Sequence, residues 1–547
     1  MKKLSLFFIF VIFGAYTFSQ EITEDGKIPE KYDRSSLTVM FVDLPSVKYW
    51  NQVKSKIDSI YFSDKYDNNN LESALIKPSS GFSSNDLQEA IKKDLLELEV
   101  GKKIISKWYN RQPDGTMNME VVHKRGRFSA SDADFLKADA TKRGESALRD
   151  YGSRLIGLSH ILVIGITDVK TASDANIKNM KGWQANVSGM LFRVDFNDEM
   201  RNALYETWIY EDDSDEVKEQ KKKAFEALEV PINHVTTKSM RVTAMQPDGD
   251  SGLSLFFKPK TKDELLQELV QKSYDEVVYR IEMDVKEFQV LTSLYDKRPL
   301  NAKIGLKEGL KTDNRFFVYE HIYNPKTNET VPKRRGVIRA KSKSKIVDNR
   351  YDAMGDMEAS EFYQVHGRRL EPGFTMQQQN DYGIEVSLGA ELGEIGGFYG
   401  RADYRLGRFV GIRALFAYGE FGIDAENYPN FPYYGDTFFN FLRYGVGLAK
   451  GLQLTRNVEL RIYLGAGGEQ ASNSDFSEDD AFTAVYVKPG ANMALNLSHN
   501  FQITGGIGAY AFISDGESES GMNIGQWDQA FSGRSGSSTF IGLKLGF

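Results

Sequence analysis

The chain ends in the stretch STFIGLKLGF, Ser538–Phe547, in which the character of the side chains alternates. Small or charged residues such as Lys544 occupy the positions between its apolar residues. A period of two is typical of a β-strand with one apolar face. The end of a chain that lies free in water is usually polar and frayed, whereas this one closes on an aromatic residue. We therefore predict a complete strand whose apolar face carries Ile541, Leu543, Leu545 and Phe547.

The same alternation recurs seven times upstream of this strand, which makes eight strands in all. The segments are 382–393, 398–407, 410–419, 438–449, 458–467, 484–498 and 501–512. Each strand has roughly ten residues, the length at which a tilted strand crosses a bilayer. In the third segment the pattern puts five residues on the apolar face, namely Val410, Ile412, Ala414, Phe416 and Tyr418.

Short and long connections alternate between these strands. The short ones lie at Gly407–Phe409, near Lys450–Asn457 and at Ser498–Asn500. The long polar ones are Ile423–Asp436, Glu469–Asp480 and Ser514–Gly536, and only the first hairpin, Glu394–Gly397, has a short outer loop. Short turns on one side and long loops on the other are typical of an outer-membrane barrel, and a sheet in lipid must close on itself. A soluble β-sandwich with one apolar face is the alternative.

With its terminal Phe547, the region Tyr382–Phe547 resembles the eight-stranded outer-membrane β-barrels of Gram-negative bacteria. In that family the last strand typically ends in Phe, which the barrel-assembly machinery reads as an insertion signal. The resemblance implies that the apolar faces contact lipid.

The charged residues between the apolar positions would then face the lumen. They are Glu385, Glu391, Arg401, Asp403, Arg405, Arg413, Arg443, Glu459 and Arg461. An eight-stranded barrel is just wide enough for side chains to fill it, so opposite charges should pair as a plug. Paired carboxylates also suit a glycosidase-like acid and base, but packing of the lumen explains them better.

The first residues, MKKLSLFFIFVIFGAYTFSQ, read as a secretory signal peptide over residues 1–19, with a membrane anchor as the alternative. The chain has no Cys, which excludes disulfides, a thiol nucleophile and Cys-ligated metals. Its formal net charge of −7 gives no indication of nucleic acid as a partner. At 547 residues it should form two to four domains.

Residues 20–297 read as a periplasmic α/β domain. The predicted strands are Ser36–Leu44 and a central strand, His160–Lys170, followed by paired strands 183–200 and 204–213 around the turn Phe196–Glu199. The predicted helices are 84–100, 144–159, 215–230 and 263–285. This order of elements is similar, in pattern only, to the periplasmic domain of the curli-secretion channel family.

Residues 298–373 read as a small periplasmic β module with a hairpin around Asn324–Thr330, followed by a linker at residues 374–381 and the barrel at 382–547. Four cations share one face of a predicted strand in the module: Arg339, Lys341, Lys343 and Lys345. Such a face can contact anionic lipid head groups or an acidic partner, or can simply be solvated.

No catalytic, cofactor-binding or metal-binding residue is predicted. The six His are scattered through the chain, and no phosphate loop or nucleophile elbow is present. Pro247–Gly252 and Ser474–Asp480 carry oxygen ligands that suit Ca²⁺, but neither has the full loop pattern, which favours a turn and a solvated loop.

These observations predict a multidomain α+β protein with a C-terminal eight-stranded transmembrane barrel. The predicted role is non-enzymatic: a filled barrel in the outer membrane anchors a periplasmic region that docks partner proteins in an assembly, secretion or scaffolding complex. Its expected partners are outer-membrane lipid and envelope proteins, with no evident small-molecule substrate. The alternatives are a surface binding or adhesion barrel that grips a ligand with long loops such as Ser514–Gly536, with Trp527, and a lipid-modifying enzyme.

Overall fold

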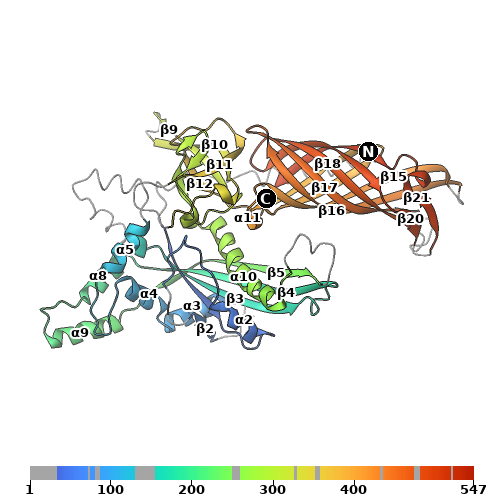
Figure 1. Ribbon diagram of the computed structural model, residues 1–547. Coiled ribbons are helices and arrows are strands. Elements are labelled where there is room, and N and C mark those ends of the chain that lie inside the picture. The colour runs from blue at the N-terminus through green and yellow to red at the C-terminus, as the bar shows by residue number, and fades with distance from the viewer. Residues whose placement is uncertain are drawn as a thin grey trace.

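The computed structural model describes residues 34–69, 71, 74–79, 87–129, 154–248, 259–325, 329–350, 358–431, 435–473, 481–518 and 521–547. Several predicted features lie wholly or mostly outside these residues: the signal peptide, the Ca²⁺ candidates Ser474–Asp480 and Pro247–Gly252, and the helix 144–159. Within them the chain forms three units: two open sheets and one closed barrel. Figure 1 shows the barrel with the two open sheets at and beside one of its ends.

The first unit contains a five-stranded sheet with the strand order β2-β1-β3-β4-β5. Its strands are β1 (Ser36–Val42), β2 (Leu75–Ile76), β3 (Ser159–Thr171), β4 (Met180–Val194) and β5 (Ile232–Pro247). β1 is parallel to β2 and β3, whereas β3, β4 and β5 are antiparallel to one another. The predicted central strand is therefore confirmed as β3, and its apolar residues Ile161–Ile164 are fully buried.

Seven helices of this unit are described: α2 (Trp50–Ile57), α3 (Leu87–Glu97), α4 (Val100–Trp108), α5 (Glu120–Ser129), α8 (Asp198–Glu206), α9 (Asp215–Glu226) and α10 (Lys262–Asp284). α10 begins with a capping box, in which the Thr261 side chain and the Glu264 side chain bond each other's backbone N–H groups. It packs against β4 and β5. A Cβ on Gly189 of β4 would lie 2.2 Å from Val277, so glycine is what permits this close approach.

Of the predicted strand pair around Phe196–Glu199, the first strand is present as β4, but the turn and the second strand, 204–213, are wrong. Asn197 instead caps α8, with its side chain accepting a hydrogen bond from Met200 N at 2.9 Å, and two carboxylates follow in the first turn. An Asn cap before acidic residues stabilises a helix start. β4 therefore pairs with β5, which lies about forty residues further along the chain and was not predicted.

The second unit is a seven-stranded antiparallel sheet with the order β6-β12-β9-β10-β11-β8-β7. Its strands are β6 (Leu291–Ser293), β7 (Asp296–Lys297), β8 (Leu300–Ala302), β9 (Arg315–Asn324), β10 (Glu329–Ala340), β11 (Ser360–Gly367) and β12 (Thr375–Gln378). β9 and β10 form the predicted hairpin. The predicted linker 374–381 is wrong, because β12 lies between β6 and β9 and Met376 is fully buried.

The third unit is a closed barrel of eight antiparallel strands, as predicted. Its strands are β13 (Ile384–Gly393), β14 (Gly397–Arg405), β15 (Leu415–Phe431), β16 (Gly435–Gln453), β17 (Val458–Ser472), β18 (Phe482–Asn496), β19 (Phe501–Phe512) and β22 (Gly536–Gly546). Each strand pairs with the next, and β22 pairs with both β19 and β13, which closes the sheet. The protein is therefore a multidomain α+β protein with an eight-stranded barrel.

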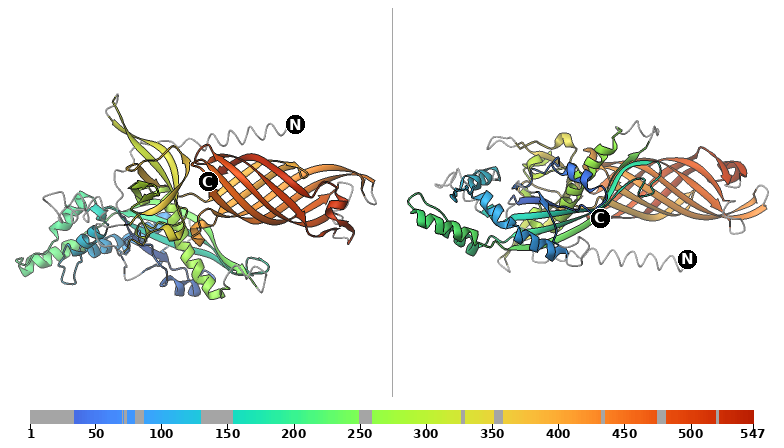
Figure 2. Two further views of the ribbon diagram at one scale, coloured as in Figure 1. Left: turned by 45° about the horizontal axis from the view of Figure 1, so that its top comes forward. Right: turned by 90° about the horizontal axis from the view of Figure 1, so that it is seen from below.

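The barrel has two different ends, which we call the inner and the outer mouth. The inner mouth carries the short connections 406–414, which includes helix α11 (Gly407–Val410), 454–457 and 497–500. The outer mouth carries the long connections and the small elements β20 (Asp515–Ser518), β21 (Asn523–Gln526) and α12 (Trp527–Ala530). Figures 1 and 2 show the second sheet at the inner mouth and β20 and β21 at the opposite end. Across the part of the chain that the structure describes, no helix is both long and apolar enough to cross a membrane.

Candidate functional site

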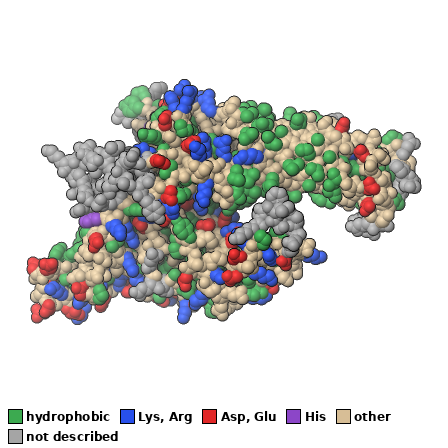
Figure 3. Space-filling view, in the orientation of Figure 1, with side chains coloured by type: hydrophobic (Ala, Val, Ile, Leu, Met, Phe, Trp, Pro, Cys, Tyr) green, Lys and Arg blue, Asp and Glu red, His purple; other side chains and the backbone are tan. Residues whose placement is uncertain are grey.

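The outer wall of the barrel is apolar. On β16 the outward residues Tyr444, Val446 and Leu448 are 51%, 69% and 56% exposed. β17 and β19 present Ile462 and Ile507 in the same way. Figure 3 shows apolar side chains spread along the barrel wall with few charges among them. A continuous apolar surface of this extent is unfavourable in water and favourable in lipid.

The terminal strand β22 has the alternation expected from its sequence. Ile541 and Phe547 are exposed on the outer wall, and Leu543 and Leu545 lie half-buried on the same wall. Lys544 points inward and is 4% exposed. The backbone N–H of Phe547 donates to Ile384 O at 2.8 Å, so the last residue takes part in the closure of the barrel.

The apolar face predicted for 410–419 is wrong. Phe416 and Tyr418 point into the lumen, while Phe421 and Ile423 are the exposed residues of β15. The reason lies in the preceding turn, where α11 ends at a left-handed Gly411 and Ala414 also has a positive φ, so β15 starts only at Leu415. A shift of one residue moves every side chain of a strand to the other face.

Eight of the nine predicted lumen residues are buried inside the barrel: Glu385, Glu391, Arg401, Asp403, Arg405, Arg443, Glu459 and Arg461. Arg413 is the exception, and its predicted place in the lumen is wrong. It lies in the connection before β15, half-buried, with its guanidinium 5.4 Å from the ring of Tyr363 in the second sheet.

The inner half of the lumen is a network of ion pairs. Arg461 lies 2.9 Å from Glu385, 3.0 Å from Glu459 and 3.3 Å from Asp403. Arg405 binds the second oxygen of Glu385 at 2.8 Å. Each charge in this region has a partner of opposite sign, which is the condition under which a charge tolerates burial.

Sequence reasoning missed several lumen residues, namely Glu420, Glu469, Lys488, Arg534 and Lys544. With them, seven buried cations (Arg401, Arg405, Arg443, Arg461, Lys488, Arg534, Lys544) face six buried carboxylates (Glu385, Glu391, Asp403, Glu420, Glu459, Glu469). Lys488 and Lys544 sit at inward positions of the period-two pattern, which could have identified them. Arg534 lies in a loop and carries no such signal. Because the numbers of buried cations and carboxylates are nearly equal, these side chains indicate a filled lumen and not an ion-selective ring.

The outer mouth is closed by aromatic side chains. Trp527 of α12 is 1% exposed and packs against Phe531 and Phe512, with ring centroids 4.6 and 5.6 Å away. Its Nε1 donates to Glu469 at 3.1 Å, and the same carboxylate binds the fully buried Arg534 at 2.8 Å. The loop Ser514–Gly536 therefore folds back as a cap, and Trp527 is not presented to an external ligand.

The inner mouth meets the second sheet through buried charges centred on Asp381. Its carboxylate binds Arg339, and Arg315 lies 3.5 Å away. Burial by itself would raise the pKa of Asp381, but the two guanidinium groups outweigh it and lower this pKa to about 2. Next to this group Asp313 accepts from Tyr363 Oη and from Ala414 N, each at 2.8 Å, which ties the barrel to the sheet.

All three inner connections of the barrel bond to the second unit. Lys343 N donates to Gly411 O at 3.0 Å, and Gly367 N donates to Asn457 Oδ1 at 2.7 Å. At the third connection the His499 ring packs edge-on against Phe317, with centroids 5.2 Å apart. The second sheet is thus held at three points around the mouth.

The first unit joins the same junction. Glu282 of α10 binds Lys65 at 2.7 Å and accepts from Asn380 Nδ2 at 2.8 Å, just before the barrel begins. Tyr279, also on α10, donates to Asp381 O at 2.7 Å. The three units therefore share one buried polar network, which we call the junction.

The predicted basic face of the second unit is wrong. β10 ends at Ala340, so the four cations do not share one strand. Arg339 is buried against Asp381, while Lys341 and Lys345 both bind Glu361, at 2.7 and 2.8 Å. Lys343 alone stays exposed without a carboxylate partner among the described residues.

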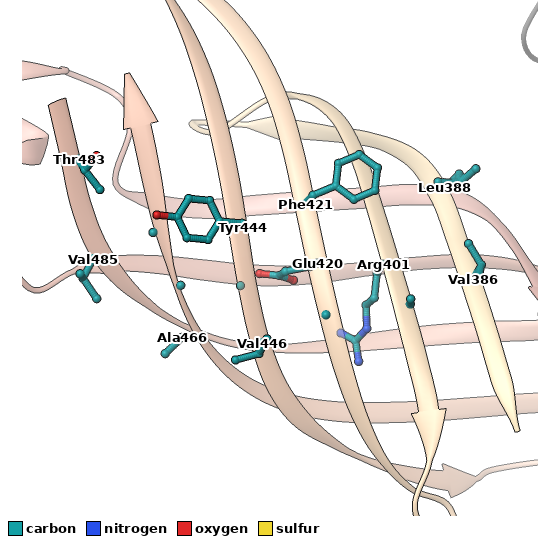
Figure 4. A pocket seen from close by; sticks show the side chains of 15 residues that line it. Val386, Leu388, Arg401, Glu420, Phe421, Tyr444, Val446, Ala466, Thr483 and Val485 are labelled. Carbon is teal, nitrogen blue, oxygen red and sulfur yellow. The ribbon is translucent and has the colours of Figure 1, made fainter. Parts of the chain in front are cut away.

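A groove of about 730 Å³ lies on the barrel wall, across β13 to β18. Small residues such as Ala402, Gly419 and Ala466 form part of it, and Phe421 and Tyr444 stand beside them (Figure 4). The charged residues among those that line it, Arg401 and Glu420, are 2% and 7% exposed in the packed lumen. Among the described residues no group of three His, Asp or Glu side chains is placed to hold a metal ion.

No protein-family model and no curated protein sequence matches the chain. Among solved structures, the N-terminal β-barrel domain of OprF of Pseudomonas aeruginosa is 13% identical, with 31% of this chain and 100% of that chain covered and a TM-score of 0.20. Neisserial surface protein A is 14% identical, covering 30% and 94% at a TM-score of 0.21. A major outer membrane protein from Thermus thermophilus is 12% identical, covering 30% and 99% at a TM-score of 0.21. At such identities and TM-scores these likenesses add nothing to the barrel assignment, which rests on the strand pairing.

Proposed function

We propose that the protein is a non-enzymatic outer-membrane protein whose barrel is an anchor. The apolar wall would lie in the membrane, and the two soluble units would lie in the periplasm beneath the inner mouth. The first unit would dock partner proteins of an envelope assembly, secretion or scaffolding complex.

One observation carries this proposal: the barrel is filled, capped at its outer mouth and bonded at its inner mouth to the rest of the protein. A lumen packed with paired charges leaves no path for solutes. A junction in which all three inner turns and α10 take part holds the soluble units in a fixed orientation. Both features suit a rigid support better than a channel.

The first unit offers a surface for docking at β5. In the described residues β5 is an edge strand of 16 residues, with Thr237 and Thr243 exposed. An edge strand has backbone N–H and C=O groups that its own sheet does not use, and these groups can pair with a strand of another protein.

The anchor is tested by fractionation of the full chain and of a chain that lacks residues 382–547. We expect the full chain to stay in membranes washed with carbonate and to migrate differently before and after boiling, as a closed barrel does. The shortened chain should appear in the soluble periplasmic fraction. A full chain that is released by carbonate would refute the membrane barrel.

Docking is tested by photo-cross-linking in cells, with the cross-linking residue at Thr237 or Thr243 and, as matched controls, at Glu517 or Asn523 of the outer mouth. We expect adducts of defined mass from β5 and none from the outer mouth. Adducts that arise only from the outer mouth would favour the alternative, a surface protein that binds an external ligand.

A further inference from the structure

The outward apolar surface of the barrel continues to the very edge of the inner mouth. Leu454 and Leu497, in two of the three inner connections, are 53% and 48% exposed, and Phe547 at the end of β22 is 44% exposed. In the third connection Phe409, Val410 and Ile412 are 50%, 52% and 48% exposed. In a membrane, the lipid head groups would therefore lie at the level of these connections.

Three cations surround the connection that carries the exposed Phe409, Val410 and Ile412. Lys343 comes from the second unit and lies along Gly411, where an added Cβ would be 3.1 Å from the Lys343 Cβ. Arg413 follows in the connection itself, and the ammonium group of Lys450 on β16 donates to its backbone carbonyl.

None of these cations forms an ion pair with a described carboxylate. Among the described residues the Lys343 ammonium group contacts no carboxylate, and the guanidinium of Arg413 faces the ring of Tyr363. The Lys450 ammonium bonds a backbone carbonyl, and the buried Asp313 acts on it only from beyond ion-pair distance. This differs from the lumen and the junction, where cations such as Arg339, Arg443 and Arg461 each bind carboxylates. Three cations that form no ion pair with a described carboxylate, beside exposed apolar side chains, are complementary to a molecule with a phosphate and acyl chains.

We propose that Lys343, Arg413 and Lys450 bind the phosphate of an anionic phospholipid in the inner leaflet, with its chains against Phe409, Val410 and Ile412. The inference rests on the proposed membrane barrel. A Lys or Arg near a membrane surface strengthens the attraction to anionic lipid by about 1 kcal/mol, which corresponds to about fivefold in affinity. The soluble units would thereby be oriented against the membrane by lipid as well as by the junction.

The test uses the full chain folded into vesicles of equal phosphatidylglycerol and phosphatidylcholine, extracted in mild detergent, with the retained lipid counted by native mass spectrometry. We expect the natural chain to retain phosphatidylglycerol preferentially. The variant K343Q/R413Q/K450Q should lose most of that preference, by about 100-fold in affinity, taken as fivefold for each cation. The control K103Q/K107Q/K223Q removes the same charge from exposed positions of α4 and α9 and should keep the preference.

Because Lys450 also bonds the backbone, the triple variant could lose lipid through a change in the structure of the turn. A second variant separates this effect from the loss of charge. Lys343→Gln changes an exposed side chain alone and should cost about fivefold. An unchanged preference in both variants would overturn the inference, and so would displacement of the lipid by inorganic phosphate at millimolar concentration. A chain that fails to fold into these mixed vesicles at all would instead refute the membrane barrel, so the two failures are distinguishable.

Discussion

The outer mouth of the barrel is closed by apolar side chains of its own last long loop, whereas the inner mouth is closed by charges shared with two other units. At the outer mouth Trp527 and Phe531 are buried among aromatic rings. At the inner mouth Asp381 binds Arg339, and Tyr279 of α10 bonds the same residue.

This difference separates a self-contained end from a connecting end. Apolar burial is non-directional and needs only that the loop excludes water. Charge-assisted hydrogen bonds are directional and fix one orientation of the groups that they join. The inner mouth therefore fixes the orientation of the two open-sheet units relative to the barrel, and the outer mouth needs no partner to be stable.

Trp527→Ala should give the largest effect, because it opens a cavity in the aromatic cap and leaves Glu469 without one of its donors. We expect a loss of about 3–5 kcal/mol in the free energy of unfolding of the barrel. Urea unfolding of the folded chain, followed by gel migration without boiling, measures it. Phe438→Ala, at an aromatic that is 52% exposed on β16, is the matched control and should cost much less. Equal losses would show that the cap is not packed.

Asp381→Ala should weaken the opposite end, since it leaves Arg339 and Arg315 buried without their carboxylate. We expect about 3 kcal/mol of destabilisation of the junction. Hydrogen exchange of the N–H groups that bond to the inner turns would report it, with faster exchange at Gly367 of β11, which donates to Asn457, and unchanged exchange at the outer mouth. Asp348→Ala, at an exposed carboxylate of the same unit, should leave the exchange as it is. Protection retained in Asp381→Ala would mean that the units are not held together by these charges.

Acid should loosen the inner mouth before the outer one. Burial, with Arg334 and Arg315 nearby, lowers the pKa of His499 to about 3, so the junction holds it neutral. Because a solvated His binds a proton at about pH 6.5, the open junction takes up a proton that the closed junction does not. The contribution of His499 to the stability of the closed junction is therefore greatest above pH 6.5 and decreases as the pH falls towards 3.

Between pH 7 and pH 5 this linkage amounts to at most about 2 kcal/mol. Asp381 contributes little to it there, because its carboxylate is ionised both in the closed junction, where its pKa is about 2, and in the open junction, where an ordinary Asp has a pKa of about 3.9. The same exchange measurement at the two pH values checks it, and His499→Gln should reduce the difference. His366, whose pKa is also lowered by burial at the inner mouth, should account for part of what remains. His123→Gln, on α5, should preserve it. A pH response that is identical in His499→Gln would assign it to other groups.

The existence and size of the barrel could be predicted from the sequence, because alternation in a two-faced strand is a local property. The same pattern placed eight lumen charges correctly, since each lies between apolar neighbours on its own strand. It also indicated β1, β3, α3, α9 and α10, where apolar runs or cap residues are strong.

The junction could not be predicted, because it joins residues far apart in the chain. Asp381 and Arg339 lie in segments that read as a linker and as a solvated face, and only the fold brings them together. The same applies to Arg534, which reaches the lumen from a loop. In β15 a turn of unforeseen length shifted the register, although the strand itself was recognised.

That register can be tested with little effect on stability, because the chain has no natural Cys and single Cys variants carry a label at one position. Phe421→Cys on the outer wall should cost less than about 1 kcal/mol, because this side chain is 41% exposed. A spin label attached there before refolding should collide freely with oxygen dissolved in the lipid. The label at Tyr418→Cys should be immobilised in the lumen or should prevent closure, because Arg401 stacks 3.6 Å from the Tyr418 ring. Lipid contact at Tyr418 and burial at Phe421 would restore the register expected from the sequence and would leave Arg401 without the ring on which it packs.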